Sequence, residues 1–237
     1  VLLLFNFEKA YFDKEQVSCE FVGHPLLEDK VDDKIDINQF VGKNQALISI
    51  FAGSRISEIN ILMPILLNFI KLMRKKYNDI TYVFHSTKEH SKLIQIYIKN
   101  SSLSNCEVIS DTKFKAHLLK KSIFAVAKSG TVSLEICNAK IPSIIIYKMN
   151  FINFLIIKML IKIKYANIIN IAANDEVIPE LLQSKCNPKN IFSVVSSFLD
   201  APAKVQEQVK KTQTILNQLK TDSSSSELAC KALNRLL

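Results

Sequence analysis

Short apolar runs alternate with longer amphipathic stretches along the middle of this 237-residue chain. An uninterrupted apolar run of about four to eight residues is typical of a strand that is covered on both faces, as in a parallel sheet. Short apolar runs, rich in Ile, Val and Phe, occupy residues 46–51, 81–84, 106–109, 123–127 and 143–147. Stretches with helical spacing separate them, so the pattern predicts an α/β fold with a Rossmann-like, doubly wound parallel sheet.

Shorter elements are predicted near the start of the chain. Residues 1–5 form an apolar run that indicates a strand, 7–14 suit a helix, and 19–22 suit a second strand. Because the chain opens on Val1 in the middle of an apolar run, we expect a fragment. We expect three parts: the end of an otherwise missing N-terminal domain with its linker at 1–40, the Rossmann-like domain at 41–202, and C-terminal helices at 203–237.

Two small-residue turns follow predicted strands and are the first candidates for a binding site. Gly53-Ser54-Arg55 follows the strand at 46–51, and Ser129-Gly130-Thr131 follows the strand at 123–127. Each turn precedes a predicted helix. Ligands of doubly wound sheets bind beyond the carboxyl ends of the strands. We therefore predict that the two turns converge on one ligand.

The residue types in these turns suit an anion. The first amides of a helix have no intrahelical acceptor and, with the helix dipole, attract negative charge. Gly130 lets a phosphate approach the backbone, and the hydroxyls of Ser129 and Thr131 can donate to it, although Thr131 can equally serve only as a helix cap. Arg55 suits a bidentate contact with a diphosphate or carboxylate, or is a solvated surface charge. Glu135, one turn into the second helix, suits ribose hydroxyls or is an ordinary first-turn acid.

A basic apolar stretch at 149–171 predicts contact with an anionic membrane surface. Its Ile, Leu and Met residues recur at helical spacing beside Lys158, Lys162 and Lys164, and no Asp or Glu occurs between Ile136 and Asn174. Such a helix would lie among lipid headgroups. The lysines interrupt every window of about 20 residues, which excludes a spanning helix. A core helix of the α/β domain is the alternative.

Composition narrows the class of protein. Hydrophobic residues at 48% and charged residues at 22% exclude a disordered chain, and the net charge of +9 favours anionic partners. Nucleic acid is not expected, because the lysines are not interleaved with exposed aromatic residues and no known module is present. The five cysteines are scattered and odd in number, which favours a reduced protein without structural zinc, and no metal site is expected. His24 is either a polar ligand contact at a domain junction or structural, and the other three histidines lack catalytic partners.

Taken in order, the motifs of this chain resemble those of lipid-A-disaccharide synthases. The similarity runs over nearly all 237 residues, and the ordered set of motifs is more specific than any single motif. The matching motifs are Phe7-Glu8-Lys9-Ala10, Phe21-Val22-Gly23-His24-Pro25, Gly53-Ser54-Arg55 with Glu58, Ser129-Gly130-Thr131 with Leu134-Glu135, and Asn170 followed by Pro179-Glu180-Leu181-Leu182-Gln183.

The resemblance implies a GT-B fold, in which the domain at 41–202 binds a UDP-sugar. It implies that UDP-2,3-diacylglucosamine is joined to 2,3-diacylglucosamine 1-phosphate with inversion and release of UDP, without cofactor or metal. Arg55 and the turn at 129–131 would stabilise the departing diphosphate. Glu135 would hold the ribose. The same donor site would include Gly53, Ser54, Asn170, Glu180 and Gln183. The general base is expected in the missing domain.

The resemblance also implies a cytoplasmic enzyme that is peripheral on the cytoplasmic face of the bacterial inner membrane, and a homodimer is compatible with it. Some positions depart from the family pattern. Ala52 and Ile169 stand where the family usually has Pro, and the Gly usual after Asn170 is absent, with Ala173-Asn174 near its place.

Two other functions are compatible with the sequence. A UDP-sugar epimerase-like enzyme would share the fold and the diphosphate site, but not the basic apolar stretch. A non-catalytic membrane-binding remnant would keep that stretch without activity. The fragment alone is expected to bind the donor weakly and to be inactive.

Overall fold

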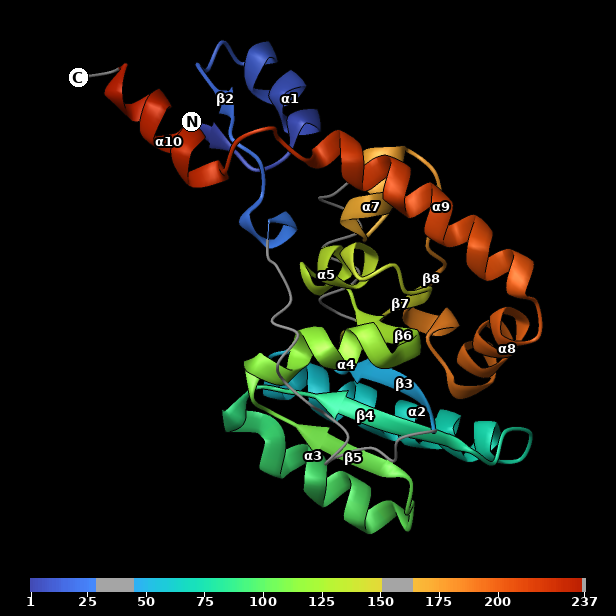
Figure 1. Cartoon of the computed structure of the whole chain (residues 1–237). Helices are drawn as coiled ribbons and strands as arrows, with labels where there is room; N and C mark the ends of the chain where they lie inside the picture. Colours follow the sequence, from blue (N-terminus) through green and yellow to red (C-terminus); the bar gives the residue numbers. More distant parts are fainter. Residues whose placement is uncertain (29–44, 151–163, 236–237) are drawn as a thin grey trace.

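A six-stranded parallel sheet forms the centre of the molecule in the computed structural model, which describes residues 1–28, 45–150 and 164–235 (Figure 1). Its strand order is β5-β4-β3-β6-β7-β8. The strands are β3 (Ala46–Phe51), β4 (Ile80–His85), β5 (Cys106–Ile109), β6 (Ser122–Lys128), β7 (Ser143–Tyr147) and β8 (Glu180–Leu182). The predicted Rossmann-like, doubly wound α/β fold is therefore confirmed.

The order of the strands reverses between β3 and β6. From β3 the chain adds strands on one side as far as β5, and it then returns to the other side of β3 and adds strands from β6 to β8. The two central strands pair in parallel, with Phe51 opposite Ala127 at their carboxyl ends. Such a reversal point is where open α/β sheets bind ligands.

Helices cover both faces of the sheet because successive side chains of each strand point to opposite faces. On one face, Ile48 and Ile50 of β3 pack in a cluster with α2 (Ile56–Arg74), α3 (Lys88–Ser101) and α8 (Pro188–Leu199). On the other, Phe51 packs in a cluster with α5 (Val132–Asn138), α7 (Ile168–Ala173) and α9 (Pro202–Leu219). A smaller cluster joins Leu47 to α4 (Lys115–Lys121), which follows the 3-10 turn η3 (Thr112–Phe114).

Helix α2 is the longest of these covering helices. Among the described residues, it is the one helix with the length and apolar composition of a membrane span. Its apolar side chains nevertheless belong to the core, since Ile59, Leu62, Met63 and Leu66 are fully buried.

The first residues of the chain form a small separate sheet that the last helix joins. β1 (Leu2–Leu3) and β2 (Glu20–Phe21) pair in parallel, and η1 (Asn6–Glu8), α1 (Lys9–Lys14) and η2 (Pro25–Leu27) accompany them. Helix α10 (Ser225–Asn234) returns beside this sheet, as Figure 1 shows. Arg235 pairs with Glu20 at 3.1 Å, and the Ser225 amide donates to Glu28 at 2.7 Å.

The predicted C-terminal part at 203–237 therefore packs in two places, partly on the large sheet and partly on the N-terminal segment. Helix α9 gives Ile215, Leu216 and Leu219 to the core of the large sheet, whereas α10 contacts the N-terminal segment. The basic stretch predicted at 149–171 falls mainly on 151–163, which lie outside the described residues. Its described end is α7, where Ile169 and Asn170 are buried in the core.

Candidate functional site

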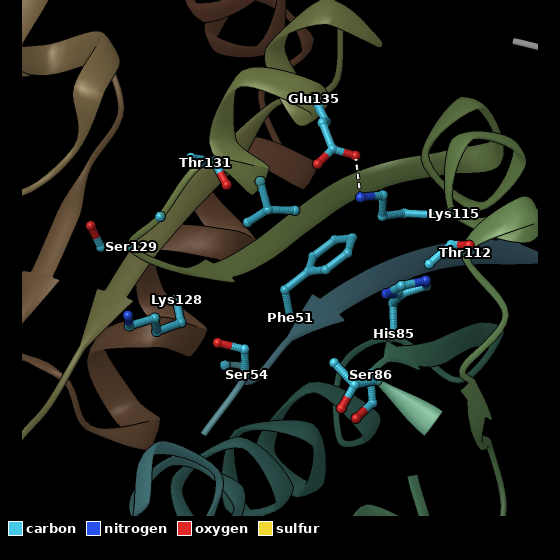
Figure 2. A pocket seen from close by; sticks show the side chains of 14 residues that line it. Phe51, Ser54, His85, Ser86, Thr112, Lys115, Lys128, Ser129, Thr131 and Glu135 are labelled. Carbon is cyan, nitrogen blue, oxygen red and sulfur yellow. Dashed lines mark ion pairs between the residues drawn. The ribbon is translucent and has the colours of Figure 1, made fainter. Parts of the chain in front are cut away.

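A cavity of about 330 Å³ opens at the carboxyl edge of the sheet, beyond the ends of β3 and β6 (Figure 2). Both turns predicted from the sequence line it. The sequence-predicted residues among its walls are Gly53, Ser54, Ser129, Gly130, Thr131 and Glu135. The remaining walls are Phe51, His85, Ser86, Thr87, Thr112, Lys115, Lys128 and Val132. The fold thus brings the two turns to one site.

The first turn is held by Glu58, from the first turn of α2. Gly53 has φ +113, a backbone conformation that residues other than glycine rarely adopt. A Cβ atom at this position would lie 2.5 Å from Glu58 Oε2. The Ser54 amide donates to the same oxygen at 3.1 Å. From the other side, His90 Nε2 donates to the Ser54 carbonyl at 3.1 Å. The backbone at 53–54 is therefore fixed before any ligand arrives.

Two cations share the second carboxylate oxygen of Glu58. Lys128 Nζ lies 3.0 Å and Arg55 Nη1 lies 3.2 Å from Glu58 Oε1. Burial by itself raises the pKa of Glu58, but Lys128, the Ser54 amide and Arg55 together outweigh it and lower this pKa. Glu58 is therefore ionised at neutral pH, and the cluster carries one more positive than negative charge.

Arg55 stands at the rim of the site. Its side chain is 76% exposed and it is not one of the residues that line the cavity. The ion pair with Glu58, three residues along the chain, holds it beside the first turn. Its predicted contact with a ligand stays a prediction, whereas Lys128 lies in the cavity wall itself.

The second turn leaves open space above its backbone. A Cβ atom on Gly130 would meet nothing closer than the Lys128 carbonyl at 4.0 Å, so neither packing nor dihedral strain requires glycine there. Thr131 stands at the cap position of α5, but its hydroxyl makes no capping hydrogen bond. The Ser129 hydroxyl donates to the Ala166 carbonyl at 2.7 Å. The alternative interpretation, in which the Thr131 side chain serves only to cap α5, is therefore wrong.

Glu135 faces a lysine that the sequence analysis did not single out. Its carboxylate pairs with Lys115 Nζ at 2.5 Å across the cavity, from α5 to α4 (Figure 2). His24 is close to the same carboxylate: burial lowers the pKa of His24, and the Glu135 charge partly opposes that shift. His24 Nδ1 also accepts the Leu26 amide at 3.2 Å, so this histidine caps η2.

His85 is a further residue that sequence reasoning missed. It ends β4, lines the cavity and lies beside the Phe51 ring with centroids 5.7 Å apart. Burial, reinforced by the Lys115 charge, lowers its pKa to about 4. The imidazole is therefore neutral at pH 7. Its place at the carboxyl end of a predicted strand was the signal that could have identified it.

Asn170 and Glu180 form a buried network next to the second turn rather than part of the cavity lining. Asn170 Nδ2 donates to Glu180 Oε1 at 2.8 Å, and Glu180 also accepts the amides of Ala166 and Asn167 at 2.8 and 2.9 Å. Gln183 Oε1 accepts the Met149 amide at 3.5 Å. The network supports the segment to which Ser129 is bonded, and the predicted ligand contacts of these three residues stay predictions.

Metal-ligating side chains are dispersed. Within the described parts of the chain, no group of three or more His, Cys, Asp and Glu side chains is arranged to hold a metal ion. The five cysteines are free thiols.

A family model and individual relatives of this chain point to the same family. A family model described as lipid-A-disaccharide synthetase matches residues 1–233. Proteins named lipid-A-disaccharide synthase from Rickettsia prowazekii and Rickettsia typhi are each 34% identical over 238 residues. The alignments cover 98% of this chain and 62% of each relative, so the chain spans about three fifths of their length.

Solved structures share the fold at low sequence identity. UDP-GlcNAc 2-epimerase from Neisseria meningitidis, bound to UDP-GlcNAc, superposes with a TM-score of 0.69 at 15% identity, over 99% of this chain and 61% of that protein. WaaG, a glycosyltransferase involved in lipopolysaccharide biosynthesis, superposes with a TM-score of 0.59 at 14% identity, over 96% and 61%. The two neighbours catalyse different reactions, so the fold alone does not choose between them.

The lowered pKa of His85 makes the stability of this protein depend on pH. The unfolded chain protonates His85 below its ordinary pKa of 6.5, whereas the folded chain does so only near 4, so stability falls as pH drops through this interval. We expect His85 to account for up to about 3 kcal/mol of this loss, and His85→Gln to remove that share and make the acid slope shallower. Urea unfolding of both chains across this pH range measures it. An equally steep acid slope in His85→Gln would assign the effect to other groups.

Proposed function

The chain belongs to the lipid-A-disaccharide synthase family, and from this membership we propose that it is the UDP-sugar-binding part of an inverting glycosyltransferase of lipid A biosynthesis. The proposed reaction joins UDP-2,3-diacylglucosamine to 2,3-diacylglucosamine 1-phosphate and releases UDP. The acceptor hydroxyl attacks the anomeric carbon, and UDP leaves with the bonding electron pair. We propose that the general base lies in the part of the relatives that this chain does not span.

The convergence of two turns on one cavity is the observation that carries this proposal. Ser54 lies on one side of the cavity and Gly130 and Thr131 lie on the other, at the reversal point between β3 and β6. The volume of about 330 Å³ suits a small ligand. The surplus positive charge of the cluster around Glu58 favours an anionic one, and a diphosphate fits both features.

The residues have distinct proposed roles in the transfer. Negative charge grows on the diphosphate as its bond to the sugar breaks, and donors already placed there lower the barrier. Arg55, exposed at the rim, is proposed to turn from Glu58 toward this charge, which would make it the catalytic residue of this part. Glu135, oriented by Lys115, is proposed to accept the ribose hydroxyls.

Association with a membrane is a separate proposal. The net charge of +9, the lysines of 149–171 and the acylated substrates together support a peripheral position on the cytoplasmic face of the bacterial inner membrane. A homodimer is compatible with the resemblance, and the chain alone is proposed to be inactive.

A UDP-sugar epimerase is the second candidate, favoured by the likeness of the fold to an epimerase bound to UDP-GlcNAc. The cavity suits either enzyme, because both need a diphosphate site. Family membership favours the transferase.

UDP binding by this chain tests the donor site. We expect Thr131→Val to weaken UDP about fivefold, the effect of one lost hydrogen bond of about 1 kcal/mol, and to leave uridine binding unchanged. Thr214→Val, an exposed position on α9, is the control. Calorimetric titration measures both ligands. UDP affinity unaltered by Thr131→Val would remove the second turn from the site.

A test of the catalytic role of Arg55 requires a protein of the full family length that contains this sequence. We expect Arg55→Ala to lower turnover by about 100-fold, because a charge that meets the leaving group is lost. Its exposed ion pair with Glu58 contributes at most about 1 kcal/mol, so stability should hardly change. Arg74→Ala, at the opposite end of α2, should leave turnover intact. Equal turnover in Arg55→Ala and the parent would exclude Arg55 from the mechanism.

A further inference from the structure

We propose that Lys128 is a further diphosphate-binding residue of this site and that Glu58 is the residue that positions it. The inference rests on the proposed function, because it deepens the description of the same donor site. The sequence-predicted site did not include Lys128, and the family motif Ser-Gly-Thr begins only at the next residue.

The position of Lys128 is set by the strand that it ends. It is the last residue of β6 and directly precedes the second turn. Phe51 is opposite Ala127 in the register of the two central strands, so Lys128 lies one step further along, next to the chain that enters the first turn. Figure 2 shows its side chain between Ser54 and Ser129, in the cavity wall. A cation at this place can meet a ligand that both turns contact.

The residues around Lys128 fix its ammonium group but leave some of its N–H donors available. The side chain is 19% exposed, and Nζ lies 5.2 Å from the centre of the Tyr147 ring. Among the described residues, Lys128 has one ion-pair partner, Glu58 Oε1 at 3.0 Å. A lysine ammonium has three N–H donors, so the bond to Glu58 leaves donors for a ligand.

The charge balance favours a second anion beside Lys128. Glu58 Oε1 also accepts from Arg55 at 3.2 Å, and Glu58 Oε2 accepts the Ser54 amide at 3.1 Å. One carboxylate therefore faces two cations and an amide, and cannot neutralise both cations. A diphosphate supplies the missing negative charge, and in a partly buried site such charge-assisted contacts are the strong ones.

A purely structural role for Lys128 makes a different prediction. If Lys128 only fixes Glu58, and through it the first turn, then its effect on a ligand must pass through Glu58. If Lys128 touches the diphosphate, its effect must survive the removal of the Glu58 charge. A double-mutant cycle separates the two roles.

The experiment titrates UDP and uridine into this chain and into Lys128→Met, Glu58→Gln and the double variant. We expect Lys128→Met to weaken UDP about tenfold or more, to change uridine by less than about twofold, and to keep its effect in the Glu58→Gln background. Lys128→Arg should retain most of the UDP affinity because it keeps the charge. Lys99→Met, exposed in the last turn of α3 and so at the opposite edge of the sheet, is the control.

Folding is checked by the thermal unfolding midpoint of each variant. If Lys128→Met does not fold, Lys128→Gln replaces it, since glutamine keeps a donor for Glu58 but not the charge. Equal weakening of UDP and uridine, or no effect of Lys128→Met once Glu58 is glutamine, would overturn the proposal. UDP affinity that falls in Thr131→Val but not in Lys128→Met would overturn the proposed role of Lys128 and leave the donor site itself intact. Failure of the parent chain to bind UDP would overturn the donor site and Lys128 with it.

Discussion

The reversal of strand order between β3 and β6 is the constraint on which the site depends. After β3 the chain passes into α2 on one face of the sheet, and after β6 it passes into α5 on the other. The two turns must therefore diverge, and the cavity lies between them. Neither turn alone creates this space, since a strand, a turn and a helix form a common local structure. The site arises because two such units stand side by side with their helices on opposite faces.

Glu58 fixes the geometry of the first turn and holds two cations beside it. Its carboxylate holds the Ser54 amide with one oxygen and Lys128 and Arg55 with the other, while Gly53 leaves room for it. Because these groups are already in place, the proposed diphosphate would require little rearrangement of the first turn, which is the basis of electrostatic catalysis. Behind the second turn, Glu180 accepts the amides of Ala166 and Asn167, and Asn170 donates to the Ile178 carbonyl. Both turns thus rest on carboxylates that do not line the cavity wall themselves, the partly buried Glu58 and the buried Glu180.

The sequence predicted the sheet better than the site. The predictions for 106–109 and 143–147 match the bounds of β5 and β7. β7 is buried over 143–146 and is marked by its apolar run, whereas β5 lies at the edge of the sheet and includes the exposed Glu107. Strand β8 was missed because it has three residues and begins with Glu180, whose charge is compensated only by amides from another segment. Both turns were found from small residues after strands. Lys115 and Lys128 were not, because their partners Glu135 and Glu58 lie 20 and 70 residues away along the chain and meet them only in the fold. Arg55 was placed in the site by its motif, whereas Glu58 holds it at the rim.

A crystal structure of this chain with UDP tests the central claim most directly. We expect the diphosphate to lie in the cavity beyond the carboxyl ends of β3 and β6, with phosphate oxygens within hydrogen-bond distance of the first turn at Ser54 and of the second turn at Gly130 and Thr131. UDP bound outside this cavity, or with its diphosphate on one turn only, would contradict the claim that the two turns form a single anion site.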